Sequence, residues 1–178
     1  VSGFVRRIRH MLFIYNAKNR GKGAVVRQGM LEARGAIRLF TDADNSTSID
    51  QFETFLPHFT KGYDVVIGSR AVAGAVMDPP QPWYRQLAGR GSNLIIQAVN
   101  LPGIWDTQCG FKAFTADAAK RIFSRSRVSG WGFDIEILAL ARAMGYRVKE
   151  APVHWVNDPF SHVKLSAYFK VFIENLSI

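Results

Sequence analysis

Cysteine is almost absent from this sequence: Cys109 is the only one among 178 residues. A single cysteine excludes an intrachain disulfide and any metal site built from several cysteines. Long hydrophobic runs are missing too, since the longest span only a few residues, such as 11–15, whereas crossing a bilayer takes ~20. The chain starts with Val1 and opens with no signal-peptide pattern, so we expect the natural protein to begin further upstream.

Acidic residues are in the minority. The chain has 23 Lys and Arg against 14 Asp and Glu, a formal charge of +9, which favours an anionic partner such as a nucleotide, a phospholipid surface or nucleic acid. Hydrophobic residues make up 48% and charged residues 21%, which is typical of a globular chain and excludes a disordered one. No repeat, low-complexity tract or linker divides residues 1–178, so we expect one domain.

Short apolar runs alternate with helical patterns in the first third of the chain. The runs at 11–15, 37–40 and 63–67 predict buried strands, and the segment 24–33 predicts a helix between the first two. Ser48 followed by Gln51 is the pattern of a capping box and predicts a second helix, with an inward stripe at Phe52, Phe55, Leu56 and Phe59. Strand, helix, strand, helix, strand is typical of a parallel α/β sheet.

The second half of the chain is less regular. We expect a functional or mobile loop over 71–82, helices over 85–100, 133–144 and 163–178, and strands over 107–114 and 148–155.

Two aspartates, Asp42 and Asp44, directly follow the predicted strand at 37–40. Ligands of open α/β sheets bind beyond the carboxyl ends of the strands, and carboxylates spaced D-x-D can face one hard cation there, Mg²⁺ or Mn²⁺. The alternative is that both aspartates only form a turn and cap the next helix. The pair by itself leaves both interpretations open.

Two further groups can recognise phosphate. NRGKG (19–23) offers Gly21 and Gly23 for close backbone approach and Lys22 for charge, but it can equally be a basic turn. Arg70 follows the predicted strand at 63–67 and is itself followed by Arg85 and Arg90. A guanidinium suits phosphate, yet a solvated basic surface explains these arginines as well.

Asp134 is the remaining carboxylate of interest. It lies in the first turn of a predicted helix, where the helix dipole favours a negative charge without any catalytic role.

These motifs occur in one order: NRGKG, TDADNST, VVIGSR, DTQCGFKAF, WGFDIEIL, EAPVHW and SHVK. Together, from about residue 16 to residue 164, they resemble family 2 glycosyltransferases of the polyprenyl-phosphate sugar synthase type. DTQCGFK and the W-x-F-D-x-E-x-L pattern are similar to the branch that glucosylates dolichyl phosphate. The resemblance implies a glycosyltransferase A fold, a Rossmann-like, mostly parallel sheet flanked by helices, and inverting transfer of a hexose, favoured as glucose from UDP-glucose, to a polyprenyl phosphate.

The resemblance also implies roles for particular residues. Asp42 and Asp44 would hold Mg²⁺ or Mn²⁺ on the donor diphosphate. The donor site would include Asn19, Gly21, Lys22, Gly23 and Asp42. The residues in catalytic positions would be Arg70, Arg85 and Asp134. The acceptor phosphate would be held by Arg85, Arg90, Ser161 and Lys164. Such an enzyme would work at a membrane surface, on the cytoplasmic face.

The chain departs from the family pattern at two places. The strand ending in N-E-E and the D-D-G-S-T-D motif of relatives are absent, so we expect a partial catalytic domain that lacks its first two strands and whose activity alone is in question. His162 also stands where relatives carry Lys or Arg.

Three alternatives stay open at this point. The first is a GDP-mannose-dependent enzyme of the same family. The second is a basic nucleic-acid-binding module, against which stands the absence of any helix-turn-helix, zinc-finger or RNP-type pattern, so we expect no nucleic-acid partner. The third is a non-catalytic module that associates with membranes through Leu165, Phe169, Phe172 and Leu176, a stripe that core packing explains equally well.

Overall fold

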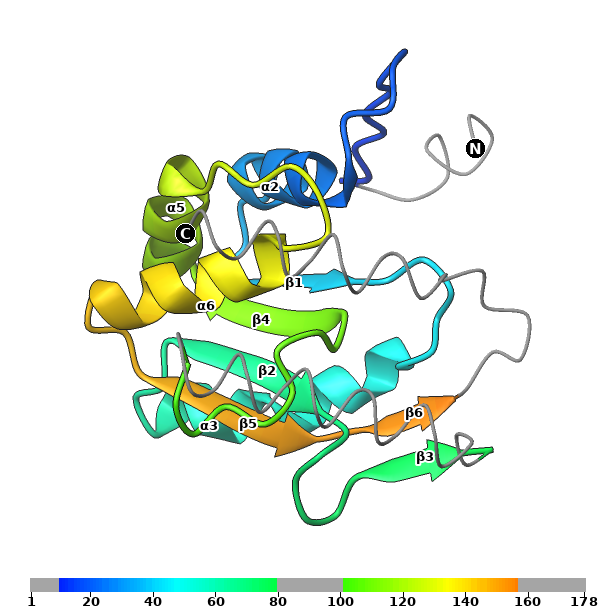
Figure 1. Cartoon of the computed structure of the whole chain (residues 1–178), viewed down its shortest axis with the longest axis vertical. Coiled ribbons are helices and arrows are strands. Elements are labelled where there is room, and N and C mark those ends of the chain that lie inside the picture. The colour runs from blue at the N-terminus through cyan, green and yellow to red at the C-terminus, as the bar shows by residue number, and fades with distance from the viewer. Residues whose placement is uncertain (1–9, 80–100, 157–178) are drawn as a thin grey trace.

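A computed structural model describes residues 10–79 and 101–156. They form a sheet with helices on both faces, so the predicted α/β class is confirmed (Figure 1). The helices are α2 (Lys22–Glu32), η1 (Ile49–Thr54), α3 (Leu56–Thr60), α5 (Ala116–Arg125) and α6 (Phe133–Ala143). The strands are β1 (Ile37–Thr41), β2 (Val65–Ser69), β3 (Val76–Asp78), β4 (Phe111–Thr115), β5 (Val148–Pro152) and β6 (His154–Val156).

The main sheet is mixed. Its four strands lie in the order β1-β4-β2-β5, with β4 antiparallel to both neighbours and β2 parallel to β5. β1, β2 and β5 therefore run in one direction, as a mostly parallel sheet requires, and β4 is inserted against them. Because β4 is reversed, its first residues lie at the same edge as the carboxyl ends of β1 and β2. β3 and β6 form a separate parallel pair.

The core has two layers because side chains alternate across the sheet. Val65 and Ile67 of β2 face α2, α5 and α6, while Val66 faces η1 and α3, where Phe55 is fully buried. Figure 1 shows α2, α5 and α6 together on the first face. All five residues of β2 are buried, which fits a central strand covered on both sides.

The helix α5 was not predicted from the sequence. Thr115 caps it, since its hydroxyl oxygen accepts a hydrogen bond from the amide of Ala118 at 3.3 Å. Its buried residues are Ala118, Ala119, Ile122 and Phe123, the i, i+1, i+4, i+5 spacing of one helical face. The predicted helices at 24–33 and 133–144 are confirmed as α2 and α6, with every boundary within two residues of the prediction.

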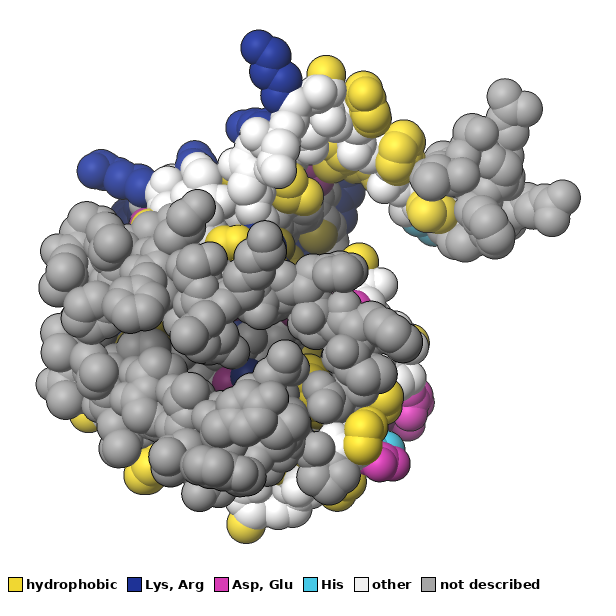
Figure 2. Space-filling view, turned by 45° about the vertical axis from the view of Figure 1, so that its right-hand side comes forward, with side chains coloured by type: hydrophobic (Ala, Val, Ile, Leu, Met, Phe, Trp, Pro, Cys, Tyr) yellow, Lys and Arg dark blue, Asp and Glu magenta, His cyan; other side chains and the backbone are white. Residues whose placement is uncertain are grey.

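The prediction of a buried strand at 11–15 was wrong. These residues form no strand, and Leu12 is 65% and Tyr15 77% exposed. A strand needs a partner for its backbone hydrogen bonds, and none pairs with it among the described residues. Figure 2 shows hydrophobic side chains along a segment that stands away from the body of the domain.

The predicted capping box was also wrong. The Ser48 side chain bonds no helical amide; instead it pairs with Asp50. Gln51 is used elsewhere, because its side-chain oxygen accepts from the His154 amide at 2.7 Å and its nitrogen donates to the His154 carbonyl at 2.8 Å. The segment forms the 3-10 helix η1 followed by α3. Of the four residues predicted to face inward, Leu56 is exposed.

Of the remaining predicted elements, the strands are confirmed, and two helices fall on residues that the structure does not describe. The strand expected at 63–67 is β2 and begins at Val65, the one at 107–114 is β4, and the one at 148–155 is divided into β5 and β6. The helices expected at 85–100 and 163–178 lie outside the described residues. Within the part of the chain that is described, no helix has the length and apolar character that crossing a membrane requires.

Candidate active site

The predicted site residues that the structure describes gather at one edge of the sheet. Asp42 follows β1, Arg70 follows β2, and the segment Asp106–Gly110 leads into β4, which runs the opposite way. Asp134 lies in the first turn of α6, the helix that covers this part of the sheet. Segments far apart in the sequence are thus brought to the carboxyl edge, where ligands of open α/β sheets bind.

Asp42 and Lys22 form an ion pair at this edge. The Lys22 ammonium lies 2.7 Å from one carboxylate oxygen of Asp42, and the two side chains keep 23% and 35% of their surface exposed. Lys22 is the first residue of α2, where a positive charge opposes the helix dipole, so the Asp42 carboxylate compensates it. The ammonium also lies 5.2 Å from the ring centre of Trp131, whose side chain is 46% exposed.

Gly21 and Gly23 let the NRGKG loop pack closely against another segment of the chain, which the sequence did not indicate. A β-carbon on Gly21 would lie 2.2 Å from the carbonyl oxygen of Ser129, and one on Gly23 would lie 2.4 Å from that of Val128. Gly21 also has φ +86°, and its amide donates to the Asn19 side chain at 2.9 Å. The close approach that these glycines permit is therefore to the chain's own loop at 128–130, and it fixes the start of α2 and Lys22 with it.

Asp44 lies two residues beyond Asp42 and is exposed. One of its carboxylate oxygens accepts from the Ser46 amide at 2.9 Å, and the Ser46 carbonyl accepts from the Val156 amide at 2.7 Å. With the Gln51–His154 bonds, β6 holds the segment after the D-x-D pair at two points.

The two aspartates fit a hard divalent cation in part. They supply oxygen ligands, as Mg²⁺ and Mn²⁺ prefer. Among the described residues no group of three or more His, Cys, Asp and Glu could hold a metal, so further ligands would have to come from a diphosphate or water.

Asp134 is buried and paired with Lys112. The Lys112 ammonium donates to one Asp134 carboxylate oxygen and, at 2.7 Å, to the carbonyl of Cys109. Burial raises the pKa of the Asp134 carboxyl above its ordinary value of 3.8, although the charges of Lys112 and Lys22 act in the opposite direction. The helix dipole alone, the alternative weighed from the sequence, leaves this buried pair unexplained.

Arg70 is held by Asp106. Its guanidinium makes two hydrogen bonds to the Asp106 carboxylate, at 2.7 and 2.9 Å, and the Arg70 amide donates a third at 3.0 Å. Burial acts to raise the pKa of Asp106, but the charge and hydrogen bonds of Arg70 outweigh it and hold that pKa below its ordinary value. The guanidinium also lies 5.3 Å from the ring centre of Trp155. Arg70 is therefore fixed in position, with 26% of its side chain exposed.

Several residues of the site were missed in the sequence. Lys112 and Asp106 are the buried partners of Asp134 and Arg70, and the half-buried Glu150 accepts from the Asp106 amide at 2.9 Å. Glu136, which belongs to the W-x-F-D-x-E-x-L pattern, accepts from the amides of Arg127 and Val128 at 2.7 and 3.0 Å and so holds the loop that packs on Gly21 and Gly23. One signal was present: Lys112 interrupts an otherwise apolar strand, FKAFT, at a position that should face the core.

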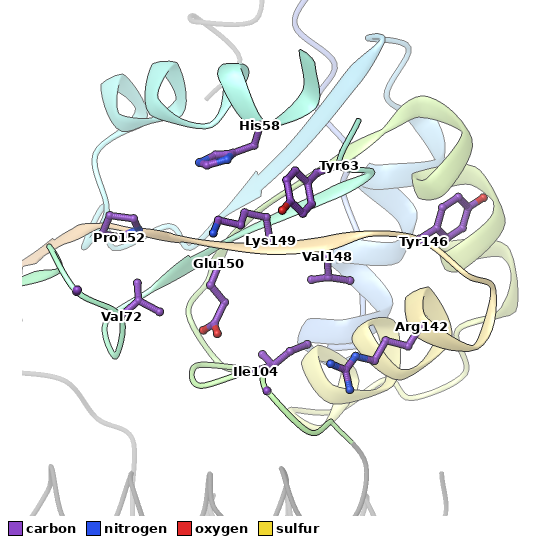
Figure 3. Close-up of a pocket in the computed structure, with 12 residues that line it drawn as sticks. His58, Tyr63, Val72, Ile104, Arg142, Tyr146, Val148, Lys149, Glu150 and Pro152 are labelled. Atoms are coloured by element: carbon purple, nitrogen blue, oxygen red, sulfur yellow. The ribbon is translucent and has the colours of Figure 1, made fainter. Parts of the chain in front are cut away.

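The predicted residues Arg85, Arg90, Ser161 and Lys164 lie outside the described part of the chain. A hollow of about 800 Å³ lies elsewhere, along β5 at the edge of the sheet opposite to β1 (Figure 3). Lys149 lies on one side of β5 with His58 and Tyr63, and Glu150 lies on the other with Arg142. No predicted site residue is among the described residues that line it.

Comparison with known proteins bears on the family and the fold of this chain. Residues 4–123 match the sequence profile of glycosyl transferase family 2. Two curated relatives, both dolichyl-phosphate beta-glucosyltransferases of Trichomonas vaginalis, are 38% identical over 167 residues and 34% identical over 180 residues. The alignments cover 90% and 98% of this chain but 49% and 55% of the relatives, so the chain spans about half their length.

A solved structure shows the same fold. Glucosyl-3-phosphoglycerate synthase from Mycobacterium tuberculosis, in complex with Mn²⁺, UDP-glucose and glycerol 3-phosphate, has a TM-score of 0.58 at 18% identity, over 88% of this chain and 54% of that one. At that identity the likeness concerns the fold, and it confirms the predicted glycosyltransferase A architecture. Since the profile matches more than half of the chain and includes the D-x-D loop and both glycines of NRGKG, this protein belongs to glycosyl transferase family 2.

Proposed function

We propose that the full-length protein transfers glucose from UDP-glucose to a dolichyl or other polyprenyl phosphate, with inversion at the anomeric carbon. The observation that carries the proposal is the convergence of Lys22, Asp42, Arg70 and Asp134 at the carboxyl edge of the sheet. The names of the two curated relatives support the glucosyl donor and the dolichyl phosphate acceptor.

The chemistry needs little from a general base. The attacking oxygen belongs to the acceptor phosphate, which is already anionic near neutral pH; it bonds to the anomeric carbon while the bond from that carbon to the nucleoside diphosphate breaks. The protein must position both partners in line and offset the charge of the leaving diphosphate. Lys22 and Arg70 supply fixed positive charge there, and Asp134 accepts a hydrogen bond from a hydroxyl of the hexose.

A divalent cation, Mg²⁺ or Mn²⁺, completes the donor site in this proposal. Asp42 and Asp44 would hold it, and it would offset negative charge on the donor diphosphate. The Mn²⁺ and UDP-glucose in the mycobacterial structure support a divalent ion without selecting one of the two.

The acceptor side rests on residues beyond the described part of the chain. We infer that Arg85, Arg90, Ser161 and Lys164 hold the lipid phosphate, and that the protein works at the cytoplasmic face of a membrane. The exposed apolar side chains at 11–15, followed by Lys18 and Arg20, support contact with a lipid surface. Cosedimentation with vesicles of anionic lipid tests this, and Phe13→Glu with Tyr15→Glu should lower the bound fraction.

The decisive experiment offers UDP-glucose and GDP-mannose side by side to the full-length protein with dolichyl phosphate. Transfer of glucose supports the proposal, and transfer of mannose alone would assign the protein to the mannosyl branch. Asp44→Ala should abolish metal-dependent transfer while the far-UV circular dichroism stays unchanged; full turnover in that variant would remove the metal assignment. Arg85→Ala should raise the apparent KM for the lipid phosphate more than that for the donor.

A further inference from the structure

Lys112 occupies a position that a core residue would normally fill. It lies in the central strand β4, directly opposite Phe40 of β1 and Ile67 of β2, both of which belong to the buried face under α2, α5 and α6. Its side chain is fully buried. A Met or Leu would satisfy the alternation of this strand, so the charge needs a separate explanation.

The ammonium of Lys112 makes its contacts within the protein. It donates to Asp134 and to the Cys109 carbonyl, and it lies 5.5 Å from the ring centre of Phe40. Only one oxygen of the Asp134 carboxylate accepts a hydrogen bond from the described residues. The donor of that bond is Lys112. The second oxygen is left for a group that is not part of the described chain.

Fold stability does not explain this pair. A buried ion pair is commonly matched or exceeded in stability by apolar residues of similar volume, because both charges lose their hydration. The location of the pair does suggest a reason, since the Lys22 ammonium, which pairs with Asp42, lies 5.8 Å from the ring centre of Phe133, the residue before Asp134. The pair thus joins the core of the sheet to the residues assigned to the donor.

We propose that Lys112 is a positioning residue, which holds one oxygen of Asp134 so that the other accepts a hydrogen bond from a hydroxyl of the transferred hexose. This rests on the proposed function, because it takes the donor to be a nucleotide sugar. Lys112 itself does not touch the substrate in this arrangement, and it acts only through Asp134.

The test compares the binding of UDP-glucose with that of UDP, by calorimetry on the full-length protein with Mn²⁺. Lys112→Met and Asp134→Asn should each weaken UDP-glucose binding roughly 10- to 100-fold, as loss of a supporting partner commonly does, and leave UDP binding unchanged. The double variant should bind UDP-glucose as Asp134→Asn does, because Lys112 has no other route to the sugar. Lys120→Met, an exposed lysine on α5, is the matched control and should change neither affinity.

Three results would overturn the inference. Equal loss of UDP and UDP-glucose affinity in Lys112→Met would mean a general structural role. A further loss of tenfold or more in the double variant would show that Lys112 acts independently of Asp134. Wild-type affinity for UDP-glucose in Lys112→Met would remove any role in binding.

Folding and the proposed function are controlled separately. Circular dichroism shows whether Lys112→Met folds. If it does not, the role of Lys112 is judged from the double variant, which buries no charge and should bind UDP-glucose as Asp134→Asn does. If the wild-type protein transfers glucose but its Lys112 variants do not show the expected affinities for UDP-glucose and UDP, only this inference is overturned. A wild-type protein that binds neither UDP nor UDP-glucose overturns the proposed function together with it.

Discussion

The carboxylate of Asp42 occupies the space that a side chain at position 110 would need. Its amide donates to the Gly110 carbonyl at 3.0 Å, and a β-carbon on Gly110 would lie 2.0 Å from one of its carboxylate oxygens. No real β-carbon approaches another atom so closely, so glycine at 110 is a condition for the position of Asp42. The glycine of DTQCGF and the first aspartate of TDADNST thus form one structural unit, although 68 residues separate them.

Gly110→Ala should therefore impair the donor site. The added methyl group must displace the Asp42 carboxylate and with it the Lys22 ion pair, and a misplacement of about 1 Å in such a site costs roughly 100-fold in rate. The measurement is kcat/KM for the nucleotide sugar in the full-length protein. Gly29→Ala is the control, because nothing lies within 4 Å of its added β-carbon in α2. It should retain activity and gain about 0.5–1 kcal/mol of unfolding free energy; an equal loss of activity in both variants would contradict the expectation.

Asp106→Asn should destabilise the fold at neutral pH and remove part of its acid sensitivity. The folded pKa of Asp106 lies below the ordinary value of 3.8, so its contribution to stability is complete above pH 3.8 and is lost as the pH falls through the folded pKa. Removing the charge from a buried pair costs roughly 3 kcal/mol. Urea denaturation at pH 7 and at pH 3 measures the effect: the gap between wild type and variant should narrow at pH 3.

Asp117→Asn serves as the matched control for that experiment. Asp117 forms an exposed pair with Arg121 at 3.8 Å and also accepts from the Tyr146 hydroxyl, and because these groups are exposed, its substitution should change the unfolding free energy by less than about 1 kcal/mol at either pH. A gap between wild type and Asp106→Asn that stayed constant with pH would mean that Asp106 stabilises the fold by shape and not by charge.

The buried pair of Lys112 and Asp134 should stabilise the fold less than apolar residues would. Lys112→Met alone leaves a buried carboxylate without its partner and should lower the unfolding free energy by roughly 3–5 kcal/mol. Lys112→Met combined with Asp134→Leu should recover most of this loss, because no charge then remains in the core. Chemical denaturation at pH 7 of both variants measures this. If the double variant were the less stable of the two, the pair would be a net stabilising element.

Cys109 should be unreactive in the folded protein. It is buried, and burial raises the pKa of its thiol from 9.0 to about 11, so at pH 8 it is a thiol and inaccessible. Its reaction with a disulfide reagent at pH 8 should be at least about 100-fold slower than in urea, where the thiol is exposed. A native rate close to the rate in urea would mean that the β4 entry opens locally on the time scale of the reaction.

Local patterns predicted a large share of the fold. Apolar runs identified β2, in which all five residues are buried, and β1, in which Phe40 is buried. Helical spacing identified α6, most of which is buried, and α2, where Met30 is buried and Val26 packs against the same core. Patterns failed where a distant residue changed the local preference. The Gln51 side chain bonds His154 and not the cap at Ser48, and the apolar run at 11–15 has no partner strand among the described residues.

The sequence by itself determined the α/β class, the D-x-D pair at a strand end and the family. These follow from periodicity and from the order of short motifs, which are local properties of the chain. The tertiary structure alone decided that the glycines of NRGKG pack on the loop at 128–130, that Gly110 makes room for Asp42, and that Arg70 is held by Asp106. It also decided that Lys112 is a partner of Asp134. Each of these relationships joins segments at least 22 residues apart, through close packing and buried charge that only the folded chain creates.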